Sequence, residues 1–221
     1  MSASPLLKTR TRIKLCGMTR EQDVDAAVAA GVDAVGFVLY APSPRAVTAR
    51  RAGELARRLP SFVTPVLLFV NPSPQEVEAA CAGVPNATLQ FHGDESPAQC
   101  LEPERPFLRA ARMTAEFDLL DFAALHGTAQ AILLDAHVDG YGGGGKVFDW
   151  SLIPQNVPRP LVLSGGLHAE NVTEGILRVR PWAVDVSSGV ERAKGVKDAE
   201  AMRWFCEQVR RADARIAAQS T

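Results

Sequence analysis

The sequence predicts one barrel of eight parallel β-strands that alternate with α-helices, the (β/α)8 fold. Eight short apolar runs recur along the 221 residues, and their starts lie about 20 to 30 residues apart, which leaves room for a helix between successive strands. The alternative is an open doubly wound sheet, which usually carries a G-x-G-x-x-G turn after its first strand. Here that turn is Cys16-Gly-Met-Thr19 and the glycine clusters come late, so the barrel is favoured.

The predicted strands read as continuous apolar segments. This pattern is typical of parallel strands whose outer face is covered by helices. No Pro- or Ser-rich linker and no block of charge divides the chain, so one domain is expected. The expected strands are Ile13–Cys16, Ala34–Leu39, Pro65–Val70, Thr88–His92, Phe107–Ala111, Ala131–Asp135, Leu161–Ser164 and Ala183–Ser187.

Helix signals fill most of the intervals between these strands. Thr19-Arg-Glu-Gln22 fits a capping box for the first helix, and Gly31 is placed to end it. Ser73-Pro-Gln-Glu76 combines a cap, a proline at the first helical position and a glutamate at the third, with Gly83 at the far end. Both segments are therefore expected to be helices that connect successive strands.

Two further caps and two short segments complete the pattern. Thr48 can cap a helix over residues 49–59, and Asp198 can cap the last helix of the chain. Segments 97–102 and 150–153 are short, so each is expected to hold a single helical turn.

The composition narrows the classes of function. Lys and Arg total 24 and Asp and Glu total 25, so no excess of positive charge is available to bind a nucleic-acid backbone. The longest apolar runs, such as Pro65–Val70, are strand-sized and fall short of the roughly 18 residues that span a bilayer. We therefore expect no nucleic-acid partner and no membrane partner.

Cysteine usage and the N-terminal segment indicate the compartment and the domain boundary. The four cysteines form no C-x-x-C pair and do not make a disulfide scaffold in a chain of this length, so a reducing, cytoplasmic setting fits best. The first residues lack the apolar stretch of a secretory signal. Residues 1–11 are expected to be a flexible tail and residues 12–221 the barrel, as a monomer or a homodimer.

Two turns of small residues follow the seventh and eighth strands, where barrel enzymes commonly bind phosphate. Glycine lets backbone N–H groups approach an anion closely, and a following helix N-terminus adds partial positive charge. Either turn alone could be only a tight connection between a strand and a helix. Together they occupy the two places at which this fold commonly binds phosphate. The predicted phosphate-binding residues are Gly165, Gly166, Ser188 and Gly189.

Cys16 ends the first strand and Asp135 ends the sixth, at the mouth where barrel enzymes work. A thiol just before a capped helix is placed to ionise, and period-two alternation puts Lys14 on the same face of its strand. Asp135 follows apolar residues, whose surroundings favour a protonated carboxyl. The alternatives are a cysteine that only fills the core and an aspartate that only caps a turn.

Other side chains near the predicted mouth carry weaker signals. His92 ends the fourth strand and fits either a loop contact or chemistry. Arg45 lies in a proline-stiffened loop after the second strand, where a planar guanidinium could hold a carboxylate. The glycine-rich loop Asp139–Lys146 could act as a lid. The remaining histidines show no metal-ligand spacing, so no metal is expected.

Taken together, the motifs resemble those of the phosphoribosylanthranilate isomerase family. The resemblance extends from about residue 12 to residue 205 and includes every strand except the fifth. Its segments are Lys14-Leu-Cys-Gly-Met-Thr19, Ala34-Val-Gly-Phe-Val38, Ser43-Pro-Arg45, Leu89-Gln-Phe-His-Gly93, Leu133-Leu-Asp135, Gly142–Gly145 with Phe148-Asp-Trp150, Leu161–Leu167 and Val184–Val190.

The resemblance implies a (β/α)8 enzyme of tryptophan biosynthesis that uses no cofactor and takes a small phosphorylated substrate. Such an enzyme converts N-(5-phosphoribosyl)anthranilate to 1-(2-carboxyphenylamino)-1-deoxyribulose 5-phosphate by an acid/base-catalysed Amadori rearrangement. By this resemblance Cys16 is the general base, Asp135 is the general acid and Arg45 holds the anthranilate carboxylate. His92 and Asp185 are candidate substrate contacts.

The sequence also departs from the family pattern and leaves alternatives open. Ala46 stands where the family usually has an aromatic residue beside the loop arginine, which puts the carboxylate contact in question. A histidine-pathway or dual-substrate isomerase would perform the same rearrangement on a bis-phosphate, but is expected to carry aspartate at the position of Cys16. A non-catalytic barrel that binds a phosphorylated sugar would need neither Cys16 nor Asp135.

Overall fold

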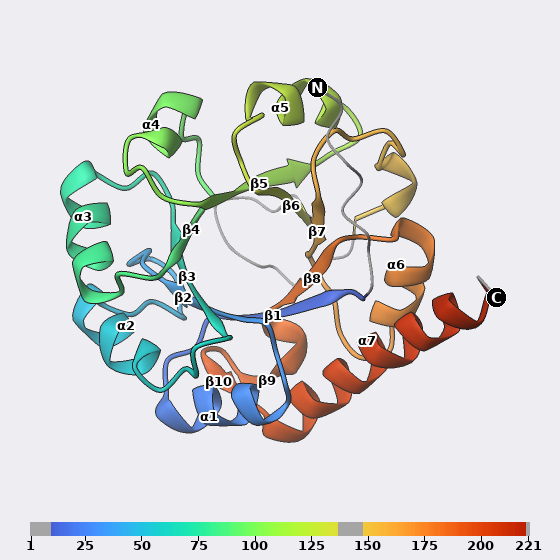
Figure 1. Ribbon diagram of the computed structural model, residues 1–221, viewed down its shortest axis with the longest axis horizontal. Coiled ribbons are helices and arrows are strands. Elements are labelled where there is room, and N and C mark those ends of the chain that lie inside the picture. The colour runs from blue at the N-terminus through green and yellow to red at the C-terminus, as the bar shows by residue number, and fades with distance from the viewer. Residues whose placement is uncertain (1–9, 137–147, 220–221) are drawn as a thin grey trace.

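Eight parallel strands close into the barrel that the sequence predicts (Figure 1). Each strand pairs with its neighbours in the chain, and β1 pairs with β8 to close the ring. The computed structural model describes residues 10–136 and 148–219, and every strand overlaps its predicted range. The strands are β1 (Arg12–Cys16), β2 (Ala34–Val38), β3 (Thr64–Phe69), β4 (Thr88–Phe91), β5 (Phe107–Met113), β6 (Ala131–Ala136), β7 (Leu161–Leu163) and β8 (Ala183–Val186).

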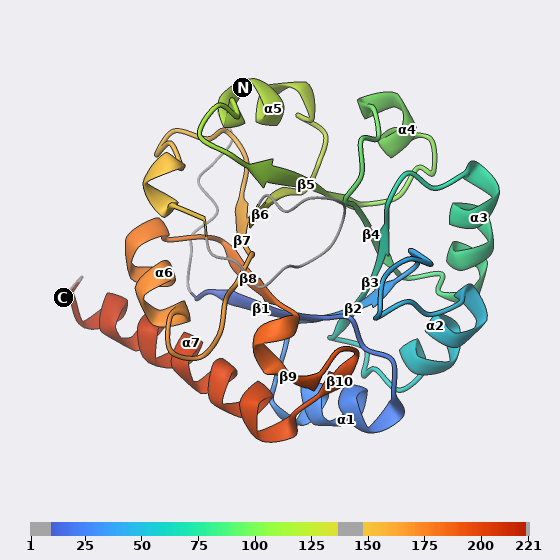
Figure 2. The same ribbon diagram turned by 180° about the vertical axis from the view of Figure 1, so that it is seen from behind.

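Helices surround the barrel on its outer side, as both views show (Figure 2). The predicted single turns are the short α4 and a 3-10 turn, η1. Within the described ranges, no helix combines the length and the apolar character needed to cross a membrane. The helical elements are α1 (Glu21–Ala29), α2 (Ala49–Ala56), α3 (Pro74–Gly83), α4 (Pro97–Leu101), α5 (Leu119–Leu125), η1 (Trp150–Leu152), α6 (Val172–Val179), η2 (Ser188–Val190) and α7 (Ala199–Gln219).

Three of the predicted helix caps are confirmed. The Ser73 hydroxyl accepts from the backbone N–H of Glu76, whose carboxylate accepts from the N–H of Ser73, so both halves of the capping box form. Thr48 caps α2, although α2 is shorter than predicted, and the Asp198 carboxylate accepts from N–H groups in the first turn of α7. These local signals therefore set the start of three helices.

The predicted capping box at the start of α1 is wrong. The helix begins at Glu21 with Arg20 as its N-cap, and no side chain caps it. The Thr19 hydroxyl instead donates to the backbone oxygen of Gly195, 2.6 Å away. The Thr19 hydroxyl therefore bonds to a residue 176 positions away in the chain and does not cap α1.

The start of the described chain is attached to the barrel. Arg10 forms an ion pair with Asp33, with its Nη1 2.8 Å from Oδ2. Both the backbone N–H and the hydroxyl of Thr11 donate to the carboxylate of Asp213, each at 2.7 Å. These two residues of the predicted tail are therefore held; the rest of it, residues 1–9, lies outside the described residues, as does the predicted lid over 139–146.

The core has three parts that explain where a site can form. The largest lies between the strands and the surrounding helices, and a smaller cluster around Leu133 fills the inside of the barrel. A third cluster contains Cys16, Val38 and Leu68, with Tyr40 packed against it. The Cys16 thiol therefore belongs to the apolar layer directly beneath the mouth of the barrel.

A short antiparallel hairpin between η2 and α7 was not predicted. It consists of β9 (Glu191–Ala193) and β10 (Val196–Lys197). Strands of three and two residues leave too little periodic pattern to be recognised in a sequence. The hairpin is important because Glu191 and Lys197 point back toward the mouth, as their contacts show.

Candidate active site

One cavity lies at the carboxyl ends of the strands and brings together most of the predicted site residues. Side chains from strands on opposite sides of the ring line it. This is the end of the barrel at which enzymes of this fold carry their chemistry. The predicted residues that line it are Cys16, Arg45, His92, Asp135, Gly165, Gly166, Asp185 and Ser188.

Cys16 and Lys14 point into the barrel from the same face of β1, as predicted. The Lys14 ammonium lies 2.9 Å from the Asp185 carboxylate, and both side chains are buried. Burial alone would lower the pKa of Lys14, but Asp185 and the neighbouring Cys16 thiolate raise it instead. The cation therefore stays charged beside the thiol.

The Cys16 thiol does not ionise as readily as the sequence predicts. Burial raises the pKa of Cys16 above its ordinary value, and the nearby charges of Lys14 and Lys197 only partly offset that effect. Moreover, α1 begins only at Glu21, so the expected effect of a helix N-terminus on the thiol has no close source. Instead, Lys14 and Lys197 favour the thiolate form of Cys16.

Asp135 is held at both carboxylate oxygens. Its Oδ1 accepts from the backbone N–H of Ala136 at 2.9 Å, and its Oδ2 lies 3.1 Å from Nε2 of His92. The other ring nitrogen of His92 lies 3.1 Å from the amide nitrogen of Gln90. Three buried polar side chains thus form a chain across β4 and β6, and His92 contacts the predicted acid directly.

Arg45 is buried at the mouth, but one edge of its guanidinium is already occupied. Its Nε and Nη2 each lie 2.8 Å from an oxygen of Glu191, and Lys197 lies 2.8 Å from the same carboxylate. Burial alone would raise the pKa of Glu191, whereas these two cations lower it. Sequence reasoning placed Arg45 correctly at the cavity and missed the carboxylate that orients it.

The two small-residue turns pack against the strand ends and against each other. Gly165 has a φ of +75°, and a Cβ atom there would collide with the backbone nitrogen of Ala136 beside the predicted acid. A Cβ atom at Gly189 would collide with the Leu167 carbonyl oxygen, and Gly189 itself does not line the cavity. Glycine at these positions is therefore required by close packing, independently of any anion.

Sequence reasoning overlooked three polar residues, Gln90, Glu191 and Lys197. Gln90 stands two residues before His92 on β4, so the period-two rule that identified Lys14 could also have found it. No sequence pattern marked Glu191 and Lys197, because the short hairpin after β8 is what brings their side chains to the cavity.

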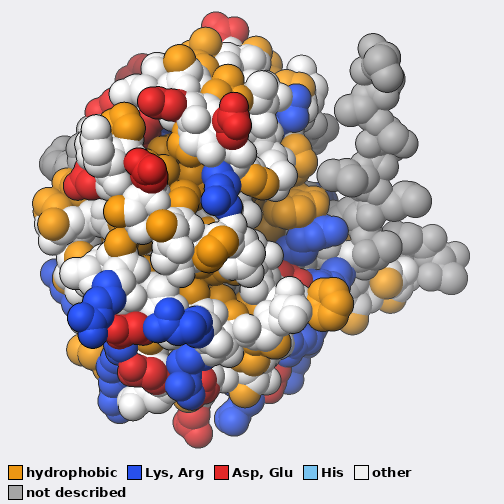
Figure 3. Space-filling model, turned by 60° about the vertical axis from the view of Figure 1, so that its left-hand side comes forward, with side chains coloured by type: hydrophobic (Ala, Val, Ile, Leu, Met, Phe, Trp, Pro, Cys, Tyr) orange, Lys and Arg blue, Asp and Glu red, His pale blue; other side chains and the backbone are white. Residues whose placement is uncertain are grey.

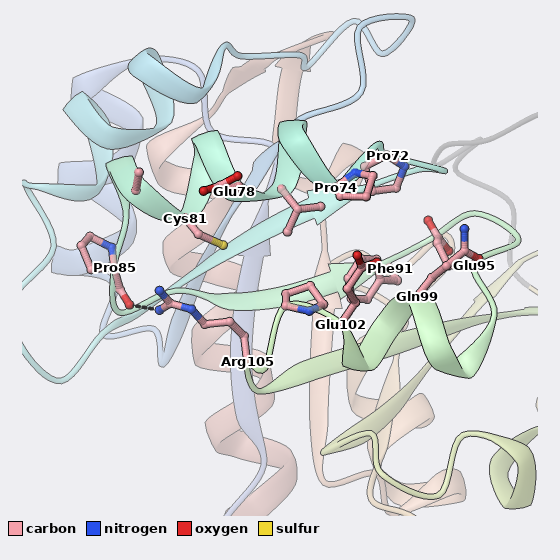
Figure 4. A pocket seen from close by; sticks show the side chains of 13 residues that line it. Pro72, Pro74, Glu78, Cys81, Pro85, Phe91, Glu95, Gln99, Glu102 and Arg105 are labelled. Atoms are coloured by element: carbon pink, nitrogen blue, oxygen red, sulfur yellow. Dashed lines mark hydrogen bonds between the residues drawn. The ribbon is translucent and has the colours of Figure 1, made fainter.

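A second cavity, of about 550 Å³, lies outside the barrel between α3 and α4 (Figure 4). Figure 3 brings this side of the molecule forward and shows apolar side chains between acidic and basic ones. Cys81 and Phe91 line it, and the Arg105 guanidinium donates to the Pro85 carbonyl oxygen. Volume alone would favour this cavity over the mouth, at about 80 Å³, but it lacks the predicted acid, base and glycine turns.

The fold and the position of the inner cavity define the class of protein: a (β/α)8-barrel enzyme with its site at the carboxyl ends of the strands. The family model for N-(5'phosphoribosyl)anthranilate (PRA) isomerase matches residues 13–208. The chain belongs to this family.

Similar proteins agree along nearly their whole length. The N-(5'-phosphoribosyl)anthranilate isomerase of Methylibium petroleiphilum is 72% identical over 209 residues, 95% of this chain and 98% of the relative. That of Dechloromonas aromatica is 58% identical over 94% of this chain and 100% of the relative. The crystal structure of the Thermotoga maritima enzyme matches with a TM-score of 0.82 and 39% identity, over 90% of this chain and 98% of that one.

Another crystal structure shows a phosphoribosyl anthranilate isomerase in complex with reduced 1-(o-carboxyphenylamino)-1-deoxyribulose 5-phosphate. It matches with a TM-score of 0.79 and 36% identity, over 90% of this chain and 98% of that one. The family resemblance, the barrel and the enzyme class predicted from the sequence are confirmed. The chain is an isomerase of N-(5'-phosphoribosyl)anthranilate and acts in tryptophan biosynthesis.

Proposed function

We propose that Cys16 is the general base and Asp135 the general acid of an Amadori rearrangement in this cavity. The observation that carries the proposal is that a thiol from β1 and a carboxyl from β6 line one cavity from widely separated strands of the ring. A substrate ribose placed between them would meet the acid on one side and the base on the other. Each well-placed acid or base contributes roughly a hundred- to ten-thousand-fold to the rate.

The rearrangement explains why these two residue types are needed. Asp135 gives a proton to the furanose ring oxygen as the C1′–O bond breaks, which leaves an iminium ion between C1′ and the anthranilate nitrogen. Cys16, as the thiolate, removes the proton from C2′ to form an enolamine. Return of a proton to C1′ with loss of the hydroxyl proton gives the ketone, so the substrate is isomerised without any net gain or loss of atoms.

The backbone around Gly165, Gly166, Ser188 and Gly189 is proposed to hold the substrate phosphate. Three of these residues line the cavity beside the acid, and the positive φ of Gly165 and Gly166 is a backbone conformation in which successive N–H groups can face an anion. The related crystal structure contains a ligand that carries a phosphate and a carboxyphenyl group, which supports a small phosphorylated substrate here. Fixed at this end, the ribose would be positioned for reaction rather than chemically activated.

Arg45 is proposed to bind the anthranilate carboxylate with the edge of its guanidinium that Glu191 leaves open. Asp185 and His92 are proposed substrate contacts, because both line the cavity as well as holding Lys14 and Asp135 respectively. No cofactor is required by this scheme, since both proton transfers are assigned to side chains of the chain itself.

We also propose that residues 12–221 act as one catalytic barrel in the cytoplasm, as a monomer or a homodimer. All of the groups assigned above come from one chain, so either state supplies a full site. A net charge of −1 supports a small-molecule partner rather than a nucleic acid or a membrane surface. Light scattering in solution would distinguish the two oligomeric states.

Replacement of the acid tests the proposed roles. Asp135→Asn keeps the shape of the side chain but has no carboxylic proton, so kcat should fall by at least about a hundredfold. Turnover is followed by the loss of fluorescence of the substrate. High activity of the Asn variant would reassign the acid, with His92 as the first candidate.

A further inference from the structure

Gln90 is a fully buried polar residue that has no part in the proposed acid–base pair. It lies on β4 with its side chain at the inner cavity, and none of its surface is exposed. Its amide nitrogen lies 3.1 Å from Nδ1 of His92, and its amide oxygen has no hydrogen-bond partner among the described residues. Burying an amide oxygen without a hydrogen-bond partner costs free energy, and an apolar side chain at this position would avoid that cost. The contact between the amide nitrogen and His92 is therefore the feature that sets Gln90 apart from an apolar residue.

The chemistry of the amide determines which ring nitrogen of His92 carries the proton. An amide nitrogen donates hydrogen bonds and accepts none, so Nδ1 of His92 must present its lone pair to Gln90. A neutral imidazole then carries its proton on Nε2. That nitrogen lies 3.1 Å from Oδ2 of Asp135, so its N–H donates to the carboxyl.

We propose that Gln90 is a positioning residue that selects the Nε2–H tautomer of His92 and thereby orients the Asp135 carboxyl. The inference rests on the proposed role of Asp135 as the acid. With this tautomer, Oδ2 accepts from His92 while Oδ1 accepts from the Ala136 N–H at 2.9 Å, which fixes the plane of the carboxyl. With the other tautomer, Nε2 would present a lone pair to Asp135, which would accept the carboxylic O–H and hold that proton away from the substrate.

The tautomer can be measured directly in the full chain by NMR with ¹⁵N-labelled histidine. Couplings to ring protons separate protonated from unprotonated nitrogens, and the spectrum of His92→Asn identifies the signals of His92. The wild-type protein should carry the proton on Nε2. Gln90→Glu places an acceptor at the same point and should draw a proton to Nδ1, whereas Gln90→Met offers no donor and should give a mixture of tautomers.

Kinetics then separate a positioning role from a purely structural one. Gln90→Glu should lower kcat by about a hundredfold and change KM by less than about threefold, because the acid is misoriented while the binding groups are kept. Gln90→Met should lower kcat by about tenfold. In the His92→Asn background, Gln90→Glu should add almost no further loss, since the residue through which it acts is gone.

Three outcomes would overturn the inference. The first is a wild-type His92 that carries its proton on Nδ1. The second is the same tautomer in the wild-type protein and both Gln90 variants, and the third is a loss of kcat that persists in full when His92 is absent. If Gln90→Glu does not fold, Gln90→Met carries both measurements. The NMR result does not depend on which group is the acid, so it stays distinguishable from a failure of the Asp135 assignment.

Discussion

At the scale of single residues, the site depends on the Cys16 thiol, whose surroundings shift its pKa in opposite directions. Burial raises the pKa of Cys16, and the buried ammonium groups of Lys14 and Lys197 lower it in part. A buried cysteine without such cations would be an inert part of the core, which is the usual fate of the residue. Lys14 therefore distinguishes Cys16 from Cys81, which is also buried and whose raised pKa is offset by the charge of Arg105.

Cys16→Ala should reduce kcat by roughly a thousandfold with little change in KM, because it removes the base and leaves the binding groups in place. Cys81→Ala is the matched control and should keep wild-type turnover. Because the pKa of the Cys16 thiol is raised, kcat/KM of the wild-type enzyme should still be increasing above neutral pH. Near-normal kcat in Cys16→Ala would show that the thiol only fills space.

The guanidinium of Arg45 provides a second test at this scale. Arg45→Ala should raise KM by roughly tenfold or more for the native substrate, since a charge-assisted hydrogen bond to a carboxylate contributes about 1.5–3 kcal/mol. The effect should be nearly absent for an analogue without the carboxylate. Arg50→Ala on α2 is the control, because that side chain is 91% exposed and, among the described residues, pairs only with Glu54. Equal losses with both compounds would assign Arg45 a structural role with Glu191.

At the scale of elements, the turns after β7 and β8 bring the strand ends and the proposed phosphate site together. Gly165 packs on the backbone beside Asp135, and Gly189 packs on the turn that follows β7. A substitution at either glycine would therefore disturb packing as well as anion binding. Ser188 lines the cavity without such a constraint, so it is the better position for testing the anion site.

Ser188→Asp should weaken the binding of inorganic phosphate and of substrate by at least about tenfold, because a carboxylate beside the proposed site repels the anion. Ser188→Ala keeps the backbone N–H groups and should bind phosphate nearly as well as the wild-type protein. Isothermal titration calorimetry with inorganic phosphate measures both variants. Unchanged affinity in Ser188→Asp would place the anion elsewhere in the barrel.

At the scale of the whole molecule, a buried ion pair lies on the seam that closes the barrel. β1 and β8 come from opposite ends of the chain, and Lys14 stands opposite Asp185 in their register. Their side chains pair at 2.9 Å with only 5% and 6% of their surfaces exposed. One pair therefore links closure of the fold to the electrostatic environment of Cys16.

Asp185→Asn should lower the free energy of unfolding by about 3–5 kcal/mol, because it leaves the Lys14 charge buried without its partner. Adding Lys14→Met should recover much of that loss, since no charge is then buried. Glu54→Gln removes two surface ion pairs on α2, with Arg50 and Arg51, and should cost less than about 1 kcal/mol. Urea unfolding near neutral pH measures all three; an Asp185→Asn loss as small as that of Glu54→Gln would contradict this account.

The pH dependence of the stability that this pair contributes follows from the direction in which the pKa of Lys14 is shifted. The pKa of Lys14 is raised in the folded protein, so its contribution is present in full below the unfolded value of about 10.4 and is lost as the pH rises through the folded pKa. The stability that this pair gives the wild-type protein should therefore be constant at neutral pH and decrease only under strongly alkaline conditions, which urea unfolding at a series of pH values measures.

The sequence by itself determined the features that depend on short stretches of chain. Strand positions follow from apolar runs, and the start of α3 follows from Ser73 and Glu76, because these signals involve neighbouring residues. The placement of Cys16, His92 and Asp135 at one cavity also followed, since parallel strands bring their carboxyl ends to the same face of a barrel.

The tertiary structure alone decided the features that depend on partners far apart in the chain. Arg45 is oriented by Glu191, 146 positions later, and Thr19 bonds to Gly195 instead of capping a helix. The raised pKa of Cys16 likewise comes from burial by several strands at once. The physical reason is shared: side-chain partners and desolvation are set by which surfaces the closed barrel brings together, and no local pattern of residues contains that information.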